Sequence, residues 1–235
     1  MVSTPVSFKF NFDELNISGD ILPPLMGYDD PAMIPDPVLE SVTELMKQGP
    51  EICNIRGGYV LTDEITVDSQ NNTVHSHGQR FDTKKIVTSQ LRNSEFAAWF
   101  VCTAGEEISH YTRQLMDEGD LIKGYVVDVL ANVVVEAAMD RIQSNLKTEI
   151  EKSGLKITNR YSPGYCDWDI AEQKKLFTIF PENYLDIALS ESCLMIPVKS
   201  VSGVIGIGKE VKFNNYTCHL CSDKNCLYRN KGIAS

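Results

Sequence analysis

Residues 160–165, Arg-Tyr-Ser-Pro-Gly-Tyr, combine side chains suited to holding a charged ligand. Arg160 offers a planar guanidinium fork that matches a carboxylate or phosphate, and tyrosine rings offer flat apolar faces with a polar tip. Pro163 fixes its own φ and favours an extended serine before it, while Gly164 can adopt a positive φ or let a ligand approach closely. The segment predicts a rigid corner that presents Arg160 and Tyr165 to a ligand. The alternative is an ordinary turn with a surface arginine.

A second group of polar residues recurs at steps of four within a long apolar segment: Asp128, Asn132, Glu136 and Asp140. Steps of four place side chains in one row along a helix. The neighbouring residues are almost all apolar, so the first half of this helix should be deeply buried. Because buried carboxylates without partners are costly, the row must meet cations, donors, water or a charged ligand. Two interpretations stay open: a narrow solvated face, or a row in which Glu136 faces a bound cation.

A third motif, Ser-Glu-Ser-x-x-Met-x-Pro-x-x-Ser-Val-Ser-Gly, occupies residues 190–203 and follows Arg-x-x-x-Gly-Tyr by about thirty residues. In this order and at this spacing, the two motifs resemble the reactivation (activation) domain of cobalamin-dependent methionine synthase. The resemblance covers roughly residues 80 to 215. It implies a reactivation module that binds S-adenosylmethionine and supports reductive methylation of the cobalt of a cobalamin protein.

The resemblance also implies roles for individual residues. Arg160 would hold the carboxylate of the ligand, and Glu136, within Val-Glu-Ala, would face its positive end. Phe213 stands where the family has a tyrosine near the adenosyl group, which is a departure from the pattern. The corner that would meet both ligand and corrinoid consists of Ser162, Pro163, Gly164 and Tyr165. No residue is assigned a catalytic role, because reduced cobalt is itself the nucleophile and the protein chiefly orients the reactants.

The partner implied by the resemblance is a separate cobalamin-binding protein, methionine synthase or another corrinoid protein. We expect this chain to act on it in trans, because no fused corrinoid, folate or homocysteine domain is recognised here. A flavodoxin- or ferredoxin-type electron donor would complete the system. Two alternatives stay open: a non-enzymatic metal-binding module with a vestigial ligand site, and a methyltransferase that uses the same ligand on another acceptor.

The cysteines near the end of the sequence form a separate motif. Cys218, Cys221 and Cys226 give Cys-x-x-Cys plus a third thiol. Three thiolates within reach of one metal predict a zinc or iron–sulfur site, which His219 or Cys193 could complete. Redox-active thiols and uncommitted cysteines are the alternatives. A cluster here would offer an electron route to the corrinoid.

Composition limits the classes of function. A hydrophobic content of 43% and a charged content of 23% are typical of a soluble globular protein. The formal net charge of −10 argues against nucleic-acid binding and against anionic lipid. The most apolar segment, residues 122–142, contains charged residues and therefore predicts no membrane span. Because no export signal is evident, the seven cysteines indicate reduced thiols or metal ligands in the cytoplasm.

The elements that must position these residues follow from periodicity and from residues that favour turns and helix caps. We expect one α/β domain of the α+β type, with the mainly antiparallel twisted sheet of the family and flanking helices that include one long buried helix. Residues 1–34 should form an extended N-terminal arm, 35–215 the activation-like domain, and 216–235 a Cys-rich tail. The expected helices are 37–48, 82–91, 105–118, 121–152 and 170–179. The expected strands are 52–61, 65–67, 73–75, 96–103, 186–189 and 201–207.

Overall fold

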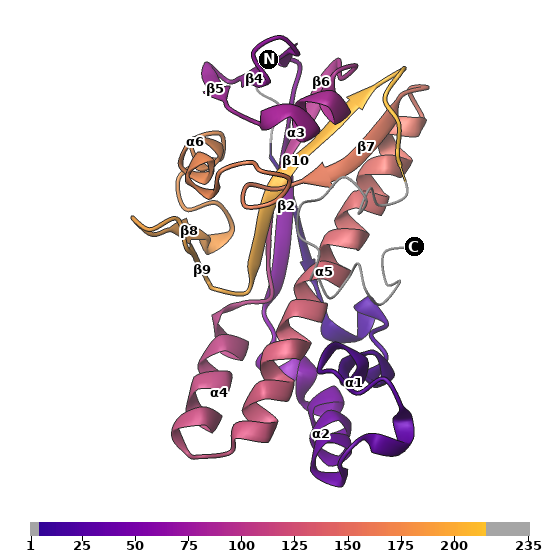
Figure 1. Cartoon of the computed structure of the whole chain (residues 1–235), viewed down its shortest axis with the longest axis vertical. Helices are drawn as coiled ribbons and strands as arrows, with labels where there is room; N and C mark the ends of the chain where they lie inside the picture. Colours follow the sequence, from indigo (N-terminus) through magenta and orange to yellow (C-terminus); the bar gives the residue numbers. More distant parts are fainter. Residues whose placement is uncertain (1–4, 215–235) are drawn as a thin grey trace.

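A five-stranded antiparallel sheet forms the centre of the fold (Figure 1). The structure, a computed structural model, describes residues 5–214. Every pair of neighbouring strands in the sheet is antiparallel, which confirms the predicted fold class. In spatial order the strands are β1 (Val6–Phe10), β2 (Ile55–Thr62), β6 (Phe96–Thr103), β10 (Ser200–Gly208) and β7 (Lys156–Tyr161).

The central strand β6 was predicted with its observed bounds because it is apolar along nearly its whole length. Alternate residues of a strand point to opposite faces of the sheet, and both faces of β6 are covered. Phe100 and Cys102 belong to the core on one face, whereas Trp99 and Val101 belong to the core on the other. From Ala97 to Thr103 the strand is buried on both sides, and its sequence therefore shows no alternation of apolar and polar residues.

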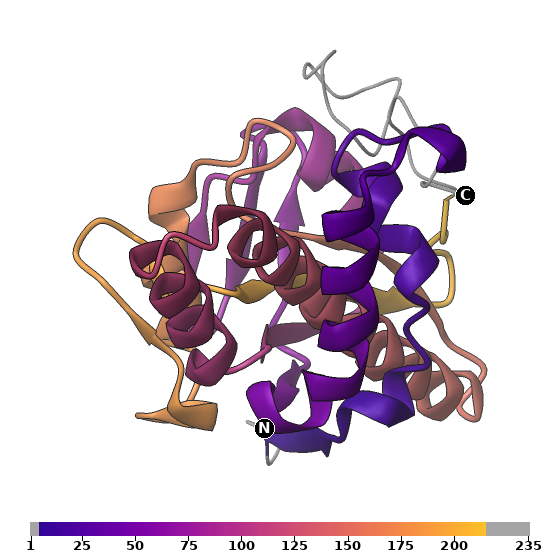
Figure 2. The ribbon, with the colours of Figure 1, turned by 90° about the horizontal axis from the view of Figure 1, so that it is seen from below.

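The first face of the sheet carries the long helix α5 (Leu121–Glu151). Its buried residues include Val126, Leu130 and Val134, which confirms the predicted buried helix. Figure 2 shows α5 between α4 (Glu106–Asp117) and α2 (Asp36–Ile52), and α1 (Leu22–Leu25) also packs on it. Short 3-10 helices η1 (Phe12–Leu15), η2 (Gly19–Ile21) and η3 (Pro31–Met33) connect β1, α1 and α2.

The second face carries smaller elements around Trp99, Trp168 and Phe81. A three-stranded sheet of β3 (Thr66–Asp68), β4 (Thr73–Ser76) and β5 (Gln79–Phe81) confirms the predicted hairpin. The remaining elements are α3 (Lys84–Leu91), η4 (Ile170–Glu172), α6 (Gln173–Phe177), η5 (Tyr184–Asp186) and the β8 (Ala188–Leu189) and β9 (Met195–Ile196) hairpin.

Several expectations differ from the structure. The helix expected at 170–179 is a 3-10 helix followed by a short α-helix that ends at Phe177, and the strand expected at 186–189 is only Ala188–Leu189. The segment expected as an extended arm contributes β1 to the sheet, and its Phe12 and Leu22 are buried in the core. Helix α2 continues to Ile52 although Pro50 predicted its end; a proline in the last turn removes only one hydrogen bond, and the backbone N–H of Cys53 still donates to Gly49. Strand β7, which carries Arg160, was not predicted.

Among residues 5–214, no helix combines the length and the apolar character needed to cross a bilayer. The domain boundaries at 34/35 and 215/216 stay predictions. The Cys-rich segment 216–235 lies outside the described residues.

Candidate functional site

Arg160 lies on strand β7, one residue before its end, and reaches across to helix α5. Its Nη2 is 2.9 Å from Oε2 of Glu136, and its Nη1 is 2.6 Å from Oδ1 of Asp140. The two carboxylates are one helical turn apart, so a single guanidinium contacts both. The structure therefore brings together two residues that are far apart in the sequence and that were both predicted to contact the ligand.

A shift in strand register explains why Arg160 faces α5. Ile157 packs in the core beneath α5, and regular alternation would place Arg160 on the opposite face of the sheet. The pairing of β7 with β10 shifts between Ile205 and Ile207, as at a β-bulge. An extra residue on one strand reverses the direction of the side chains that follow it. Arg160 consequently shares the face of Ile157, while Tyr161 belongs to the core on the other side.

The rest of the polar row on α5 meets a second cation. Lys199, immediately before β10, places its Nζ 2.8 Å from Oδ1 of Asp128 and 3.0 Å from Oδ1 of Asn132. The row is thus bound by two cations, each contacting two successive members. Both cations are largely buried, with 14% of the Lys199 side chain and 15% of the Arg160 side chain exposed. This arrangement satisfies the carboxylates that the sequence placed beside apolar residues.

The cluster around Arg160 carries more negative than positive charge when its carboxyl groups are ionised. Burial raises the pKa of Glu136 above its ordinary value of 4.5; the Arg160 guanidinium opposes this shift, and the Asp140 charge adds to it. Two carboxylates facing one guanidinium leave one excess negative charge. The site is therefore suited electrostatically to a ligand that brings an additional cation.

The corner after β7 is compact, and its tip is exposed. Pro163 is buried, Gly164 has a φ of +96°, and 71% of Tyr165 is exposed. The backbone N–H of Gly164 donates to the carbonyl of Trp168 at 2.7 Å, and that tryptophan is 1% exposed. A buried tryptophan thus anchors a loop that holds the tyrosine outward, as the predicted rigid corner requires.

The glycine that ends Ser-Val-Ser-Gly, Gly203, packs against the start of the same corner, which leaves no room for a side chain. A Cβ atom built on Gly203 would collide with the backbone oxygen of Tyr161 and lie 2.9 Å from Oγ of Ser162. Strand β10 therefore approaches the start of the corner more closely than a side chain would allow. The two sequence motifs are in direct contact at this point.

Phe213 follows β10 and lies beside the C-terminal half of α5, beyond Arg160 and its two carboxylates. Nζ of Lys147 is 5.9 Å from the centre of its ring, and 52% of Phe213 is exposed. Lys147 follows Asp140 by seven residues, which is about 10 Å along the helix. The backbone oxygen of the next residue, Asn214, accepts a hydrogen bond of 2.6 Å from Nδ2 of Asn159. Asn159 precedes Arg160 in β7.

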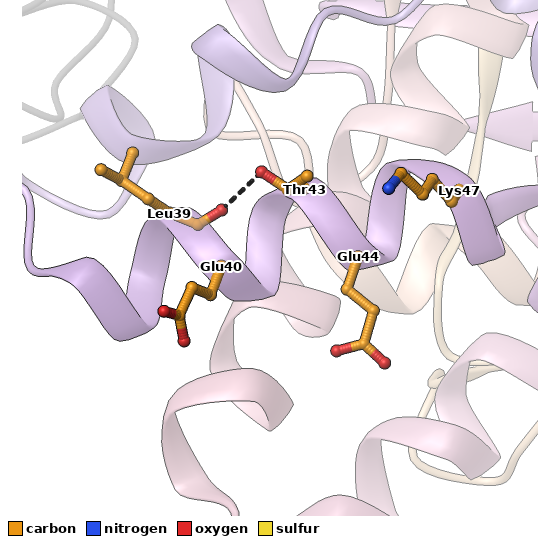
Figure 3. A pocket seen from close by; sticks show the side chains of 5 residues that line it. All are labelled: Leu39, Glu40, Thr43, Glu44 and Lys47. Atoms are coloured by element: carbon orange, nitrogen blue, oxygen red, sulfur yellow. Dashed lines mark hydrogen bonds between the residues drawn. The ribbon is translucent and has the colours of Figure 1, made fainter.

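Two hollows in the structure lie away from this cluster. One of about 390 Å3 lies on the solvent face of α2 and is lined by Leu39, Glu40, Thr43, Glu44 and Lys47 (Figure 3). The other, of about 200 Å3, is lined by Phe177 at the end of α6 and mainly by residues of the α6–β8 connection, including Phe180 and Tyr184. Neither is lined by Arg160 or Glu136. At Arg160, ion pairs between side chains occupy the position predicted for a charged ligand.

No group of three or more His, Cys, Asp or Glu side chains within residues 5–214 is arranged to hold a metal ion. Cys218, Cys221 and Cys226 lie outside this range, and their predicted metal site stays a prediction. Cys102 lies close enough to Glu136 and Arg160 for their charges to affect it, but burial raises the pKa of its thiol to about 12. A thiol with this pKa is protonated at neutral pH and is not a nucleophile.

Comparison with known proteins gives a family match and matches to solved structures. The family model described as vitamin B12 dependent methionine synthase, activation domain, matches residues 66–229. A crystal structure of the MetH reactivation domain bound to AdoHcy is similar with a TM-score of 0.62 and 15% sequence identity, covering 90% of this chain and 80% of that chain. At this identity the likeness shows a shared fold. None of the curated proteins matches the chain.

Proposed function

Because this chain belongs to the vitamin B12-dependent methionine synthase activation domain family, we propose that it binds S-adenosylmethionine and supports reductive methylation of the cobalt in a separate cobalamin protein such as methionine synthase. The observation that carries this proposal is the meeting of Arg160 with Glu136 and Asp140, directly before the corner that exposes Tyr165. The similar MetH reactivation domain, whose crystal structure holds AdoHcy, supports the choice of ligand.

The charges of the cluster match the charged end of S-adenosylmethionine. This ligand carries an α-carboxylate, an α-ammonium and a sulfonium. The Arg160 fork would take the carboxylate, and Glu136 would face the cationic groups. The excess negative charge of the cluster favours a ligand with a net positive charge over the neutral zwitterion S-adenosylhomocysteine. Release of the demethylated product is favoured by the same difference.

The exposed corner would orient the ligand toward its partner. Tyr165 offers a flat ring at the surface, where a large apolar ring system could stack against it. Phe213, which follows β10 and lies beside Lys147 of α5, would contact the adenosyl end of the ligand. The partner's corrinoid would accept the sulfonium methyl group, with an electron supplied by a flavodoxin- or ferredoxin-type donor. This chain would hold the ligand, exclude competing orientations and act on the rate through proximity.

Calorimetric titration with S-adenosylmethionine tests the proposal. The wild-type protein should show saturable binding, and Arg160→Ala should weaken it by about 30-fold or more, because the ligand carboxylate loses a charged partner. Arg160→Lys should also bind more weakly, because an ammonium cannot form the two parallel hydrogen bonds of the fork.

Arg141→Ala is the matched control. Arg141 is the residue of α5 that follows Asp140, and its Nη2 donates a hydrogen bond of 2.7 Å to the backbone oxygen of Glu14 instead of contacting the cluster around Arg160. Its removal should leave the affinity unchanged within about twofold. Equal affinity of wild type and Arg160→Ala, with unchanged far-ultraviolet circular dichroism, would show that the ligand binds elsewhere.

We also propose a zinc ion or iron–sulfur cluster held by Cys218, Cys221 and Cys226. Their spacing supports the proposal, since Cys-x-x-Cys followed by a third cysteine is a sequence pattern that metal sites use. Metal content and visible absorbance of anaerobically purified protein should show stoichiometric metal that Cys221→Ser removes. Stoichiometric metal together with no binding of S-adenosylmethionine would favour a metal-binding module instead of a reactivation module.

A further inference from the structure

The guanidinium of Arg160 is already held by two carboxylates that differ in their surroundings. Glu136 contacts Nη2 and Asp140 contacts Nη1, so the two nitrogens that would form a fork on a ligand carboxylate are both engaged. The Asp140 side chain is 67% exposed, whereas that of Glu136 is 44% exposed. A ligand carboxylate can bind in bidentate fashion only if at least one of these contacts breaks.

Asp140 is the carboxylate that can leave at the lower cost. When it separates from Arg160, its exposed carboxylate regains water, and exposed ion pairs contribute little net free energy. Glu136 is more buried, and burial already raises its pKa, so separation from Arg160 would leave its charge poorly solvated. The exchange of partners at Arg160 should therefore take place on the Nη1 side.

We propose that Asp140 is an affinity-setting residue: its carboxylate occupies the position on Arg160 that the ligand carboxylate takes, and the ligand must displace it. This inference rests on the proposed function. The pairing keeps Arg160 satisfied and oriented when no ligand is bound. It also lowers the apparent affinity for any ligand whose carboxylate binds the fork.

The other half of the polar row provides a matched control. Asp128 lies on the same helix and also forms an ion pair with a largely buried cation, Lys199, at 2.8 Å. It precedes Asp140 by twelve residues, about 18 Å along the helix. Asp128→Asn and Asp140→Asn remove the same charge from the same helix with the same change of side chain. A difference between the two variants therefore reports on Arg160 and not on net charge.

The experiment is calorimetric titration of the full chain with S-adenosylhomocysteine and with S-adenosylmethionine. S-adenosylhomocysteine lacks the sulfonium charge and isolates competition for Arg160 from general attraction of a cation. We expect Asp140→Asn to bind S-adenosylhomocysteine about fivefold more tightly than wild type, because an ion pair with one exposed partner is worth about 1 kcal/mol. Asp128→Asn should stay within about twofold of wild type. Asp140→Glu, which restores a carboxylate, should bind more weakly than Asp140→Asn.

Each result decides the question. Unchanged affinity in Asp140→Asn would overturn the inference while leaving ligand binding intact. Weaker binding in Asp140→Asn would also overturn it, since Asp140 would then contact the ligand's ammonium instead of competing with its carboxylate. Absence of binding in wild type and both variants would overturn the proposed function and this inference together. A gain in affinity is not produced by damage to the fold, so tighter binding would support displacement of Asp140.

Discussion

Two opposing effects act on the pKa of Glu136. Burial, the larger effect, raises the pKa above 4.5, and the Arg160 charge opposes it. Because the ionised form is disfavoured in the folded protein, Glu136 contributes unfavourably to stability at neutral pH. This penalty decreases as pH falls through the raised pKa and is absent below the ordinary value, where the carboxyl group is protonated in both folded and unfolded states.

The same shift predicts the pH dependence of ligand binding. Only ionised Glu136 attracts the cationic groups of S-adenosylmethionine, so affinity should fall with decreasing pH, starting above pH 4.5. Titration calorimetry across this range should show the fall in wild type. Glu136→Gln should bind more weakly at neutral pH and lose this pH dependence. A fall of equal size and midpoint in Glu136→Gln would assign the titration to another group.

At the residue scale, the sequence singled out Arg160 and the polar row on α5 but not how they pair. Helical periodicity alone places Asp128, Glu136 and Asp140 in one row. Periodicity gives no indication of which strand faces that row, and regular alternation along β7 would have pointed Arg160 away from it. The register shift that turns Arg160 toward α5 depends on tertiary pairing with β10. For this reason Lys199 and the Asp140 contact were not predicted.

Lys199 links the segment before β10 to helix α5. The ammonium of Lys199 contacts Asp128 and Asn132 and is largely buried. Lys199→Ala should lower the free energy of unfolding by about 1–2 kcal/mol, since a charge-assisted contact is lost and Asp128 keeps its charge. Urea denaturation measures the change.

Lys152→Ala is the control for this prediction. Its pair with Glu149 lies on the same helix, but the two side chains are 64% and 61% exposed. The free energy of unfolding should change by less than about 0.5 kcal/mol. Equal effects of the two lysine substitutions would mean that the buried contact does not stabilise the protein.

The contact between α5 and the sheet also requires a glycine. A Cβ on Gly57 in β2 would lie 2.5 Å from Cδ1 of Ile142 and 2.8 Å from Sγ of Cys102, which are both fully buried. Gly57→Ala should therefore destabilise the protein by about 1–3 kcal/mol through overpacking.

Gly124→Ala, inside α5, serves for comparison in thermal unfolding. The three atoms nearest its Cβ would all belong to the side chain of Met116, no closer than 3.1 Å, and methionine adapts readily. Because alanine favours helix by about 1 kcal/mol over glycine, this variant should be neutral or more stable. A stable Gly57→Ala would show that α5 can move off the sheet without cost.

Element prediction succeeded where local sequence decides the structure. Strand β6 and helix α5 are long and strongly apolar, and no competing pattern interrupts them. Strand β1 was not predicted because its alternating residues lie in a segment of 34 residues with scattered prolines and glycines. They form a strand by pairing with β2. Strand β7 was not predicted because its polar residues give no alternation of apolar and polar positions. Its extended backbone depends on pairing with β10. Tertiary pairing decided both cases.

At the scale of the whole molecule, the first and last segments should contribute differently. Residues 6–10 form an edge strand, and Phe12 anchors the chain in the core. Deletion of residues 1–12 should therefore lower the melting temperature by several degrees or abolish folding. Deletion of 216–235 should leave the affinity for S-adenosylmethionine nearly unchanged, because Glu136, Arg160 and Phe213, the residues proposed to hold the ligand, all precede this segment. Loss of ligand binding in the second variant would place part of the site in the Cys-rich segment.

The measurement that tests the proposed role most directly is methyl transfer from S-adenosylmethionine to a methionine synthase fragment without its own activation domain. The fragment is incubated anaerobically with a chemical reductant, and the visible spectrum of its cobalamin is followed. We predict methylation that requires this chain, is lost with Arg160→Ala and is retained with Arg141→Ala. Methylation at the same rate without the chain, or with Arg160→Ala in its place, would contradict the account.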